Sequence, residues 1–127
     1  MRHRKIKAGI LGGISIAAIW LALLVHRAHL RCSAQNVVFK DQISHLRTDA
    51  EHQLHIGSAK SEVSSFFENH GIVVSFFAGE ASGSKRAIAC GPVACGDAAI
   101  VHVSVRVDAG GAVIAPPEVS GIYTDCL

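Results

Sequence analysis

The chain has 127 residues, with 12 Lys and Arg, 10 Asp and Glu, and a formal net charge of +2. From residue 32 onward, six Lys and Arg face ten Asp and Glu, so that part carries a net charge of −4. This distribution excludes a basic nucleic-acid-binding surface. The roughly 95 residues that follow the N-terminal segment suffice for one small domain.

The first 25 residues have the pattern of a membrane-targeting segment. Residues 1–7 form a basic tail with four Lys and Arg, and residues 8–25 form an uncharged apolar run of 18 residues. Eighteen helical residues span roughly 27 Å, close to the thickness of the hydrocarbon core. Residues 8–25 are therefore predicted to be a transmembrane signal-anchor, and residues 26–34 a linker.

The positive charges beside the apolar run predict its orientation. Four Lys and Arg lie before it, whereas only Arg27 and Arg31 follow closely. The positive-inside rule then places the tail in the cytoplasm and the C-terminal domain in the periplasm, on a single-pass protein of the inner membrane. Two alternatives are secretion after cleavage at Ala28 or Ala34, and lipid attachment at Cys32.

Small residues recur at every fourth position of the predicted anchor, at Gly9, Gly13 and Ala17. This spacing lets two membrane helices approach closely. The anchor is thus expected to be a monomer or to form a homodimer through these residues.

Residues 35–127 are predicted to form the extracytoplasmic domain, which opens with two helices. The first covers residues 35–55, because apolar side chains recur on one face at Phe39, Ile43, Leu46, Ala50 and Leu54. A second helix is expected from Ser58 as N-cap to Gly71, a natural left-handed stop. Its expected buried face is Val63, Phe66 and Phe67.

Short strands follow the helices. Strands are expected at residues 72–77, 86–90, 98–107, 112–115 and 119–124, and the Gly- and Ser-rich residues 78–85 are expected to be a loop. In residues 98–107, Val alternates with polar residues, which indicates a half-buried strand. Residues 108–111 form an expected hairpin turn, and Pro116-Pro117 indicate an edge position. The fold class is therefore α+β, with two helices packed on a three- or four-stranded antiparallel meander.

Four cysteines, Cys32, Cys90, Cys95 and Cys126, all follow the predicted anchor. An even number in a small extracytoplasmic domain predicts two disulfides, and local geometry favours Cys90–Cys95, which leaves Cys32–Cys126. In a cytoplasmic domain the same residues would be free thiols.

Two side-chain patterns carry candidate chemistry. On the polar face of the first helix, His45, Glu51, His52 and His55 are candidate metal ligands or pH-sensing groups, although no HExxH motif is present. The stretch from Ser82 to Lys85 has the form S-x-x-K but lacks the partner motifs of the penicillin-interacting enzymes, so we interpret it as a chance match. No catalytic residues, cofactor or enzymatic activity are predicted.

One segment resembles a known family. It contains Ile56-Gly57-Ser58, Glu62-Val63, Phe66-Phe67 and Gly71-Ile72. This pattern resembles the opening of the BamE (SmpA/OmlA-like) group of small bacterial envelope lipoproteins, in which a helix after a Gly-Ser/Thr turn leads into an antiparallel meander. The resemblance implies non-enzymatic binding or scaffolding in the cell envelope, with a protein partner that the sequence does not identify. The alternative function is a small metal-binding or pH-sensing envelope domain that uses the histidines.

Overall fold

The computed structural model describes residues 2–92 and 95–126, with side chains described from residue 16 onward. The chain divides into an N-terminal unit, residues 1–34, and a second unit, residues 35–127.

The N-terminal unit is helical throughout its described residues. Helix α1, Arg2–Gln53, begins here and includes residues 26–34, the predicted linker. Large apolar side chains between Ile16 and Val25 are exposed. Residues 8–15 of the predicted anchor, which include Gly9 and Gly13, lie outside the residues whose side chains are described. Among the described residues, no helix has the length and apolar character needed to cross a bilayer.

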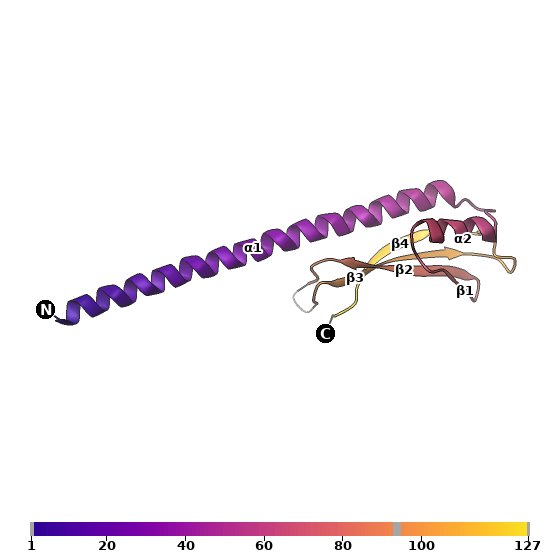
Figure 1. Ribbon diagram of the computed structural model, residues 1–127. Coiled ribbons are helices and arrows are strands. Elements are labelled where there is room, and N and C mark those ends of the chain that lie inside the picture. Colours follow the sequence, from indigo (N-terminus) through magenta and orange to yellow (C-terminus); the bar gives the residue numbers. More distant parts are fainter. Residues whose placement is uncertain (1, 93–94, 127) are drawn as a thin grey trace. The chain divides into compact units, whose positions relative to one another are not determined.

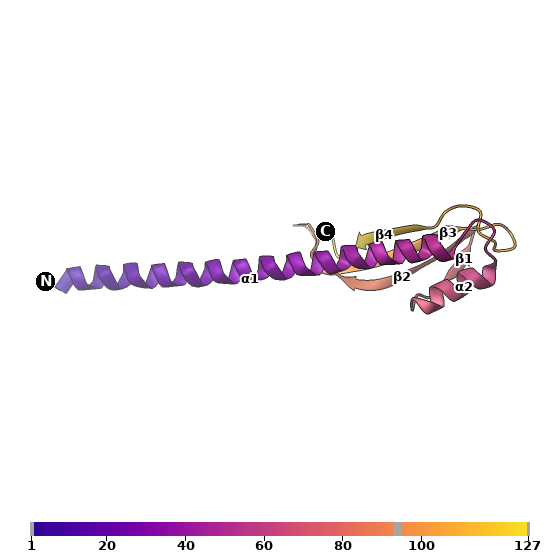
Figure 2. The ribbon, with the colours of Figure 1, turned by 90° about the horizontal axis from the view of Figure 1, so that it is seen from above.

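The second unit has the predicted α+β architecture. It contains the last part of α1, helix α2 (Lys60–Asn69), and strands β1 (Ser75–Phe77), β2 (Glu80–Ile88), β3 (Ala98–Arg106) and β4 (Glu118–Tyr123). The strands form one antiparallel sheet in the order β1-β2-β3-β4. Both helices lie on the same face of this sheet, and the other face is open (Figures 1 and 2). The prediction of two helices on an antiparallel meander is therefore confirmed.

The core lies between the helices and the covered face of the sheet. The predicted apolar stripe is confirmed, because Phe39, Leu46 and Ala50 of α1 and Leu54 just after its end are buried, and Ile43 packs against them. The helix ends at Gln53, two residues before the predicted end. The valines that alternate along β3 complete the core. Arg47 at the flank of this stripe donates a hydrogen bond of 2.9 Å to the carbonyl oxygen of Val119 in β4. That bond ties α1 to the last strand.

Helix α2 packs as predicted but begins one residue later than expected. Val63, Phe66 and Phe67 are buried in the same cluster as the β3 valines. The N-cap is Ala59, whose backbone N–H donates to the Glu62 carboxylate at 2.7 Å. The prediction of Ser58 as N-cap is wrong, because its hydroxyl instead accepts a hydrogen bond from the backbone N–H of His55.

Strand β2 is the largest departure from the predicted elements. Residues 80–85 lie in this strand rather than in a loop, and only Ala78 and Gly79 form the turn from β1. Both turn residues have positive φ, 50° and 81°. A two-residue turn of this kind aligns the twist of the flanking strands. The Gly and Ser residues extend because β3 offers nine consecutive pairing positions, Ala98 to Arg106.

Two of the predicted C-terminal strands differ from the structure only in extent, and a third is absent. The strand predicted at 98–107 is β3, and the strand predicted at 119–124 is β4, shifted by one residue. The predicted strand at 112–115 is wrong, because only a single bridge between Val107 and Val113 forms there. Asp108 stabilises the predicted turn by accepting hydrogen bonds from the backbone N–H groups of Gly110 and Ala112.

Candidate functional site

A groove of about 240 Å³ lies beside α1 on the helix-covered face of the sheet. We call it the α1/β2 groove. Side chains from α1, from the end of α2, and from β2 and β3 line it: Asp41, Gln42, His45, Leu46, Asp49, His70, Lys85, Arg86 and Val101. Segments that are far apart in the sequence therefore meet in one depression.

The groove exists because α2 is shorter than the strands beneath it. This helix ends at Asn69, and the second half of β2 then lies beyond its C-terminus. Lys85 pairs in register with the buried Val101, on the row of β2 that faces the helices. Strand alternation would usually place an apolar residue at this position, so Lys85 brings a positive charge to a groove that Leu46 and Val101 also line.

The two walls of the groove carry opposite charges that form no ion pair with each other. On the α1 wall, Asp41 lies 3.4 Å from His45, and Asp49 lies 3.2 Å from His70. On the β2 wall, Lys85 Nζ donates to the carbonyl oxygen of His70 at 3.4 Å. The side chain of the next residue, Arg86, forms neither a hydrogen bond nor an ion pair within the described residues.

His70 connects the end of α2 to α1. Its Nδ1 lies 2.8 Å from the carbonyl oxygen of Phe66, and its Nε2 lies 3.2 Å from the Asp49 carboxylate. The ring also stacks on Phe66, with a centroid distance of 4.4 Å. Both nitrogens face oxygen acceptors, so only the doubly protonated imidazolium donates to both.

The histidine candidates from the sequence are not brought together. His45 lines the α1/β2 groove, two helical turns from His52, which corresponds to roughly 10 Å along the axis. Glu51 and His55 line a different depression beside Pro116 and Pro117. Within residues 2–92 and 95–126, with side chains from residue 16, no group of three or more His, Cys, Asp or Glu side chains could hold a metal ion.

The S-x-x-K stretch lies in β2, where successive side chains alternate between faces. Ser82 and Lys85 are three residues apart and therefore point to opposite sides of the sheet. On the open face, the hydroxyl of Ser84 lies 2.9 Å from His102 Nδ1. This pair is exposed and joins directly opposed residues of β2 and β3, which is typical of a cross-strand contact that stabilises a sheet.

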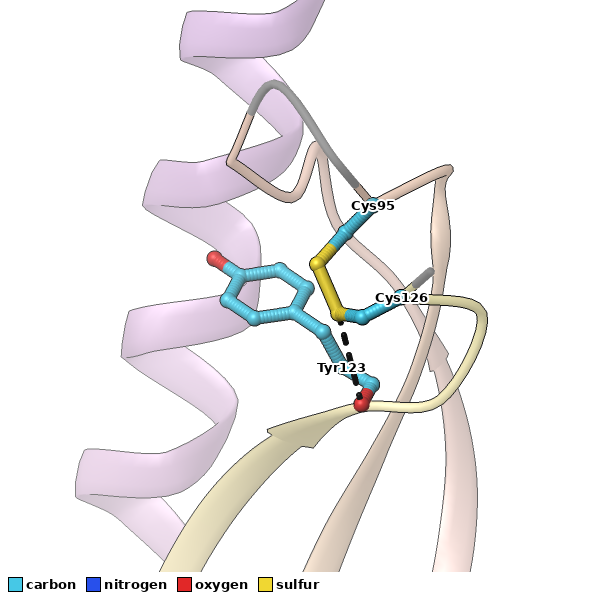
Figure 3. The surroundings of a disulfide bond; sticks show 3 residues. All are labelled: Cys95, Tyr123 and Cys126. Carbon is cyan, nitrogen blue, oxygen red and sulfur yellow. Dashed lines mark hydrogen bonds between the residues drawn. A yellow bond between two sulfur atoms is a disulfide. The ribbon is translucent and has the colours of Figure 1, made fainter.

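Disulfide bonding of the cysteines is confirmed, but the predicted pairing is wrong. Cys95 bonds with Cys126, and Cys32 and Cys90 are also disulfide-bonded. Figure 3 shows the Cys95–Cys126 bridge beside Tyr123, whose ring lies 5.9 Å from that of Phe39 in α1. Cys126 Sγ is 3.9 Å from the Tyr123 carbonyl oxygen. The bridge closes a loop of 31 residues and links β3 and β4 at their ends.

Sequence reasoning missed most of the groove. Asp49, His70 and Arg86 received no role, because the groove arises only when α1, α2 and β2 are assembled. The sequence did contain one signal of the groove, which is Lys85. It shares one face of β2 with the small residues Ala81, Gly83 and Ala87, so it marks a polar position on the face that packs against the helices. Comparison of the chain with protein-family models, with curated proteins and with solved structures gave no match.

Proposed function

We propose that this chain is a membrane-anchored, non-enzymatic binding module of the bacterial cell envelope, and that its partner inserts a side chain into the α1/β2 groove. The observation that carries the proposal is the pair of oppositely charged walls, Asp41 and Asp49 against Lys85, which are not paired with each other. A partner that presents both charges would complete these ion pairs and gain charge-assisted hydrogen bonds.

The size of the groove favours a protein partner over a small molecule. Ligand pockets usually measure roughly 300–1,000 Å³, whereas this groove measures about 240 Å³. A single side chain of a docked protein fits such a volume. Leu46 and Val101 supply apolar contact at its base, and charged walls of this kind set register and specificity more than affinity.

Two features support the envelope location and the anchor. The bonded cysteines are typical of an oxidising, extracytoplasmic compartment. The uncharged run at residues 8–25 behind a basic tail is typical of a signal-anchor in the inner membrane. The resemblance of residues 56–72 to the BamE group points to the same class of function. Gly9, Gly13 and Ala17 offer a route to pairing of two anchors.

The groove is tested by cross-linking in membranes followed by co-purification. Lys85→Glu inverts the charge of the β2 wall and removes only the 3.4 Å hydrogen bond from Lys85 Nζ to the carbonyl oxygen of His70, so the domain stays folded. The matched control is Arg106→Glu, an exposed arginine at the far end of β3. We expect the first variant to lose the partner and the control to retain it. Equal recovery with both variants would exclude the groove as the binding site.

The topology is tested separately with a reporter that is active only in the periplasm, fused after Leu127. The four Lys and Arg of the tail are expected to hold the N-terminus in the cytoplasm, so the reporter should be active. A signal only from a cytoplasmic reporter would refute both the location and the orientation.

A further inference from the structure

His70 is the C-cap residue of α2, and its side chain lies between oxygen atoms of two different helices. Nδ1 is 2.8 Å from the carbonyl oxygen of Phe66, one turn back in the same helix, and Nε2 is 3.2 Å from Oδ2 of Asp49 in α1. The ring stacks on Phe66, and the side chain is 21% exposed. These contacts hold the ring in place while solvent still reaches it.

This arrangement suits the imidazolium and not the neutral imidazole. A neutral ring carries one N–H, so it donates to one of the two oxygens and turns a lone pair toward the other. The contact with Phe66 is the shorter one and lies within the helix, so we expect the neutral ring to keep its proton on Nδ1. The lone pair of Nε2 then faces the Asp49 carboxylate at 3.2 Å and is repelled by it. Loss of one proton therefore breaks the contact between α2 and Asp49.

The charged groups around His70 come from both helices and from β2. Asp49 of α1 faces the ring, and Lys85 of β2 donates through Nζ to the backbone carbonyl oxygen of His70 at 3.4 Å. Farther along the α1 wall, Asp41 and His45 pair with each other at 3.4 Å, and β3 contributes no charged residue to the groove. The C-terminus of α2 carries a partial negative charge, which favours a cation at this position.

Asp49 also lines the α1/β2 groove, so the protonation state of His70 determines whether its carboxylate is available there. The Asp49 side chain is 49% exposed, which leaves it within reach of a docked side chain. When the imidazolium pairs with the carboxylate, the two charges compensate each other. When the ring is neutral, a guanidinium or ammonium group can replace the imidazolium and form a charge-assisted hydrogen bond. A proton on His70 and a basic side chain in the groove therefore compete for the same carboxylate.

We propose that His70 is a protonation switch for the α1/β2 groove: a Lys or Arg side chain of the partner binds Asp49 when the imidazole is neutral, and the imidazolium excludes it. The switch rests on the binding function proposed above, and it specifies the charge of the inserted side chain. Histidine changes its charge between pH 5 and pH 8, so the groove becomes available as the pH rises through this range.

The switch is tested with a probe that does not depend on the natural partner. N-acetylarginine methylamide carries the guanidinium as its single charge. It is titrated into the isotope-labelled full chain in detergent micelles, and NMR shifts of the backbone amides around Asp49 and Lys85 report its binding. We expect the apparent affinity to rise at least about fivefold from pH 5 to pH 8. An affinity that does not change with pH, or no binding at either pH, would overturn the proposal.

Substitutions at the histidines identify the group that titrates. His70→Gln keeps an amide donor near the Phe66 carbonyl oxygen but cannot change its charge, so the affinities at the two pH values should become equal. His55→Gln, at an exposed histidine that lines a different depression, is the matched control and should keep the rise. A rise that persists in His70→Gln would overturn the proposal.

The other histidine of the groove is tested in the same way. The side chains of the His45–Asp41 pair are 76% and 66% exposed, and exposed pairs of this kind are weak. We therefore expect His45→Gln to keep the rise in affinity. Loss of the rise in this variant would assign the pH dependence to His45 and overturn the proposal.

Asp49→Asn tests the other member of the switch. It keeps an oxygen that accepts a hydrogen bond from His70 but carries no charge, so the probe should no longer bind at pH 8. Amide spectra that are unchanged outside the groove show that the variant is folded, and probe binding that persists would overturn the proposal.

Recovery of the cross-linked partner at both pH values separates the switch from the binding function itself. We expect more partner at pH 8 than at pH 5. Recovery that is lost in Lys85→Glu but equal at the two pH values would overturn the switch alone. Equal recovery with Lys85→Glu and Arg106→Glu would instead exclude the groove as the binding site, whatever the titration with the probe shows.

Discussion

Gly121 in β4 lets α1 approach the sheet closely. A Cβ atom at this position would lie 2.5 Å from Cδ1 of Ile43 and 2.6 Å from Cζ of Phe39. Real Cβ atoms do not come so near to other heavy atoms, so any side chain would displace the helix or rotate the buried Phe39 ring. A missing side chain in the last strand therefore sets how closely the first helix packs.

Gly121→Ala is expected to lower the free energy of unfolding by about 1–3 kcal/mol, the usual cost of overpacking a core. The neighbouring Ser120→Ala lies on the open face and should change it by less than about 0.5 kcal/mol. Urea titrations of the full chain in detergent, read by resistance to brief proteolysis, measure both. A neutral Gly121→Ala would mean that α1 is packed less closely than described.

At the scale of elements, the sequence predicted those whose apolar residues have a clear period. The stripe from Phe39 to Leu54 has the period of a helix, and the alternating valines of β3 have the two-residue period of a strand. Both predictions were confirmed. Strand β2 was missed because Gly83 and its flanking serines have low strand propensity. Pairing with β3 overrides that propensity, and a single sequence does not reveal the pairing partner.

The packing of α2 depends most on Phe66, which is 1% exposed and contacts Phe67 edge to face at 5.7 Å. Phe66→Ala is expected to cost about 3–5 kcal/mol, a large share of the roughly 5–15 kcal/mol typical of a folded protein. Ser65→Ala, exposed on the same helix, is the control and should be nearly neutral. A loss below about 1 kcal/mol for Phe66→Ala, in the same proteolysis assay, would refute this account of the core.

At the scale of the whole molecule, the cysteine pairing and the groove were not predictable for the same reason. Cys90 and Cys95 are close in sequence, but the β3–β4 hairpin brings Cys126 opposite Cys95 in an antiparallel bridge. The groove likewise combines Asp49, His70 and Arg86 from three separate elements. Such long-range neighbours follow from the topology, whereas sequence spacing reveals only local ones.

The Cys95–Cys126 bridge is expected to stabilise the domain mainly by restricting its unfolded state. In the chain-entropy model, a loop of 31 residues corresponds to roughly 3–4 kcal/mol. The double variant Cys95→Ala/Cys126→Ala should lose about that amount in a urea titration, with the other disulfide kept intact. If the double variant unfolded at the same urea concentration as the parent protein, the unfolded chain would already be restricted without this bridge.

The contact between α1 and β4 also affects events during synthesis. Arg47 and Val119 are 72 residues apart, so at about 5–20 residues per second the ribosome needs roughly 4–14 s to make the strand that the helix packs against. During that interval the apolar stripe of α1 has no sheet to cover it, and exposed stripes of this kind promote aggregation. The nascent chain thus has a vulnerable period of seconds, in which a holding chaperone would protect the first helix until the last strand arrives.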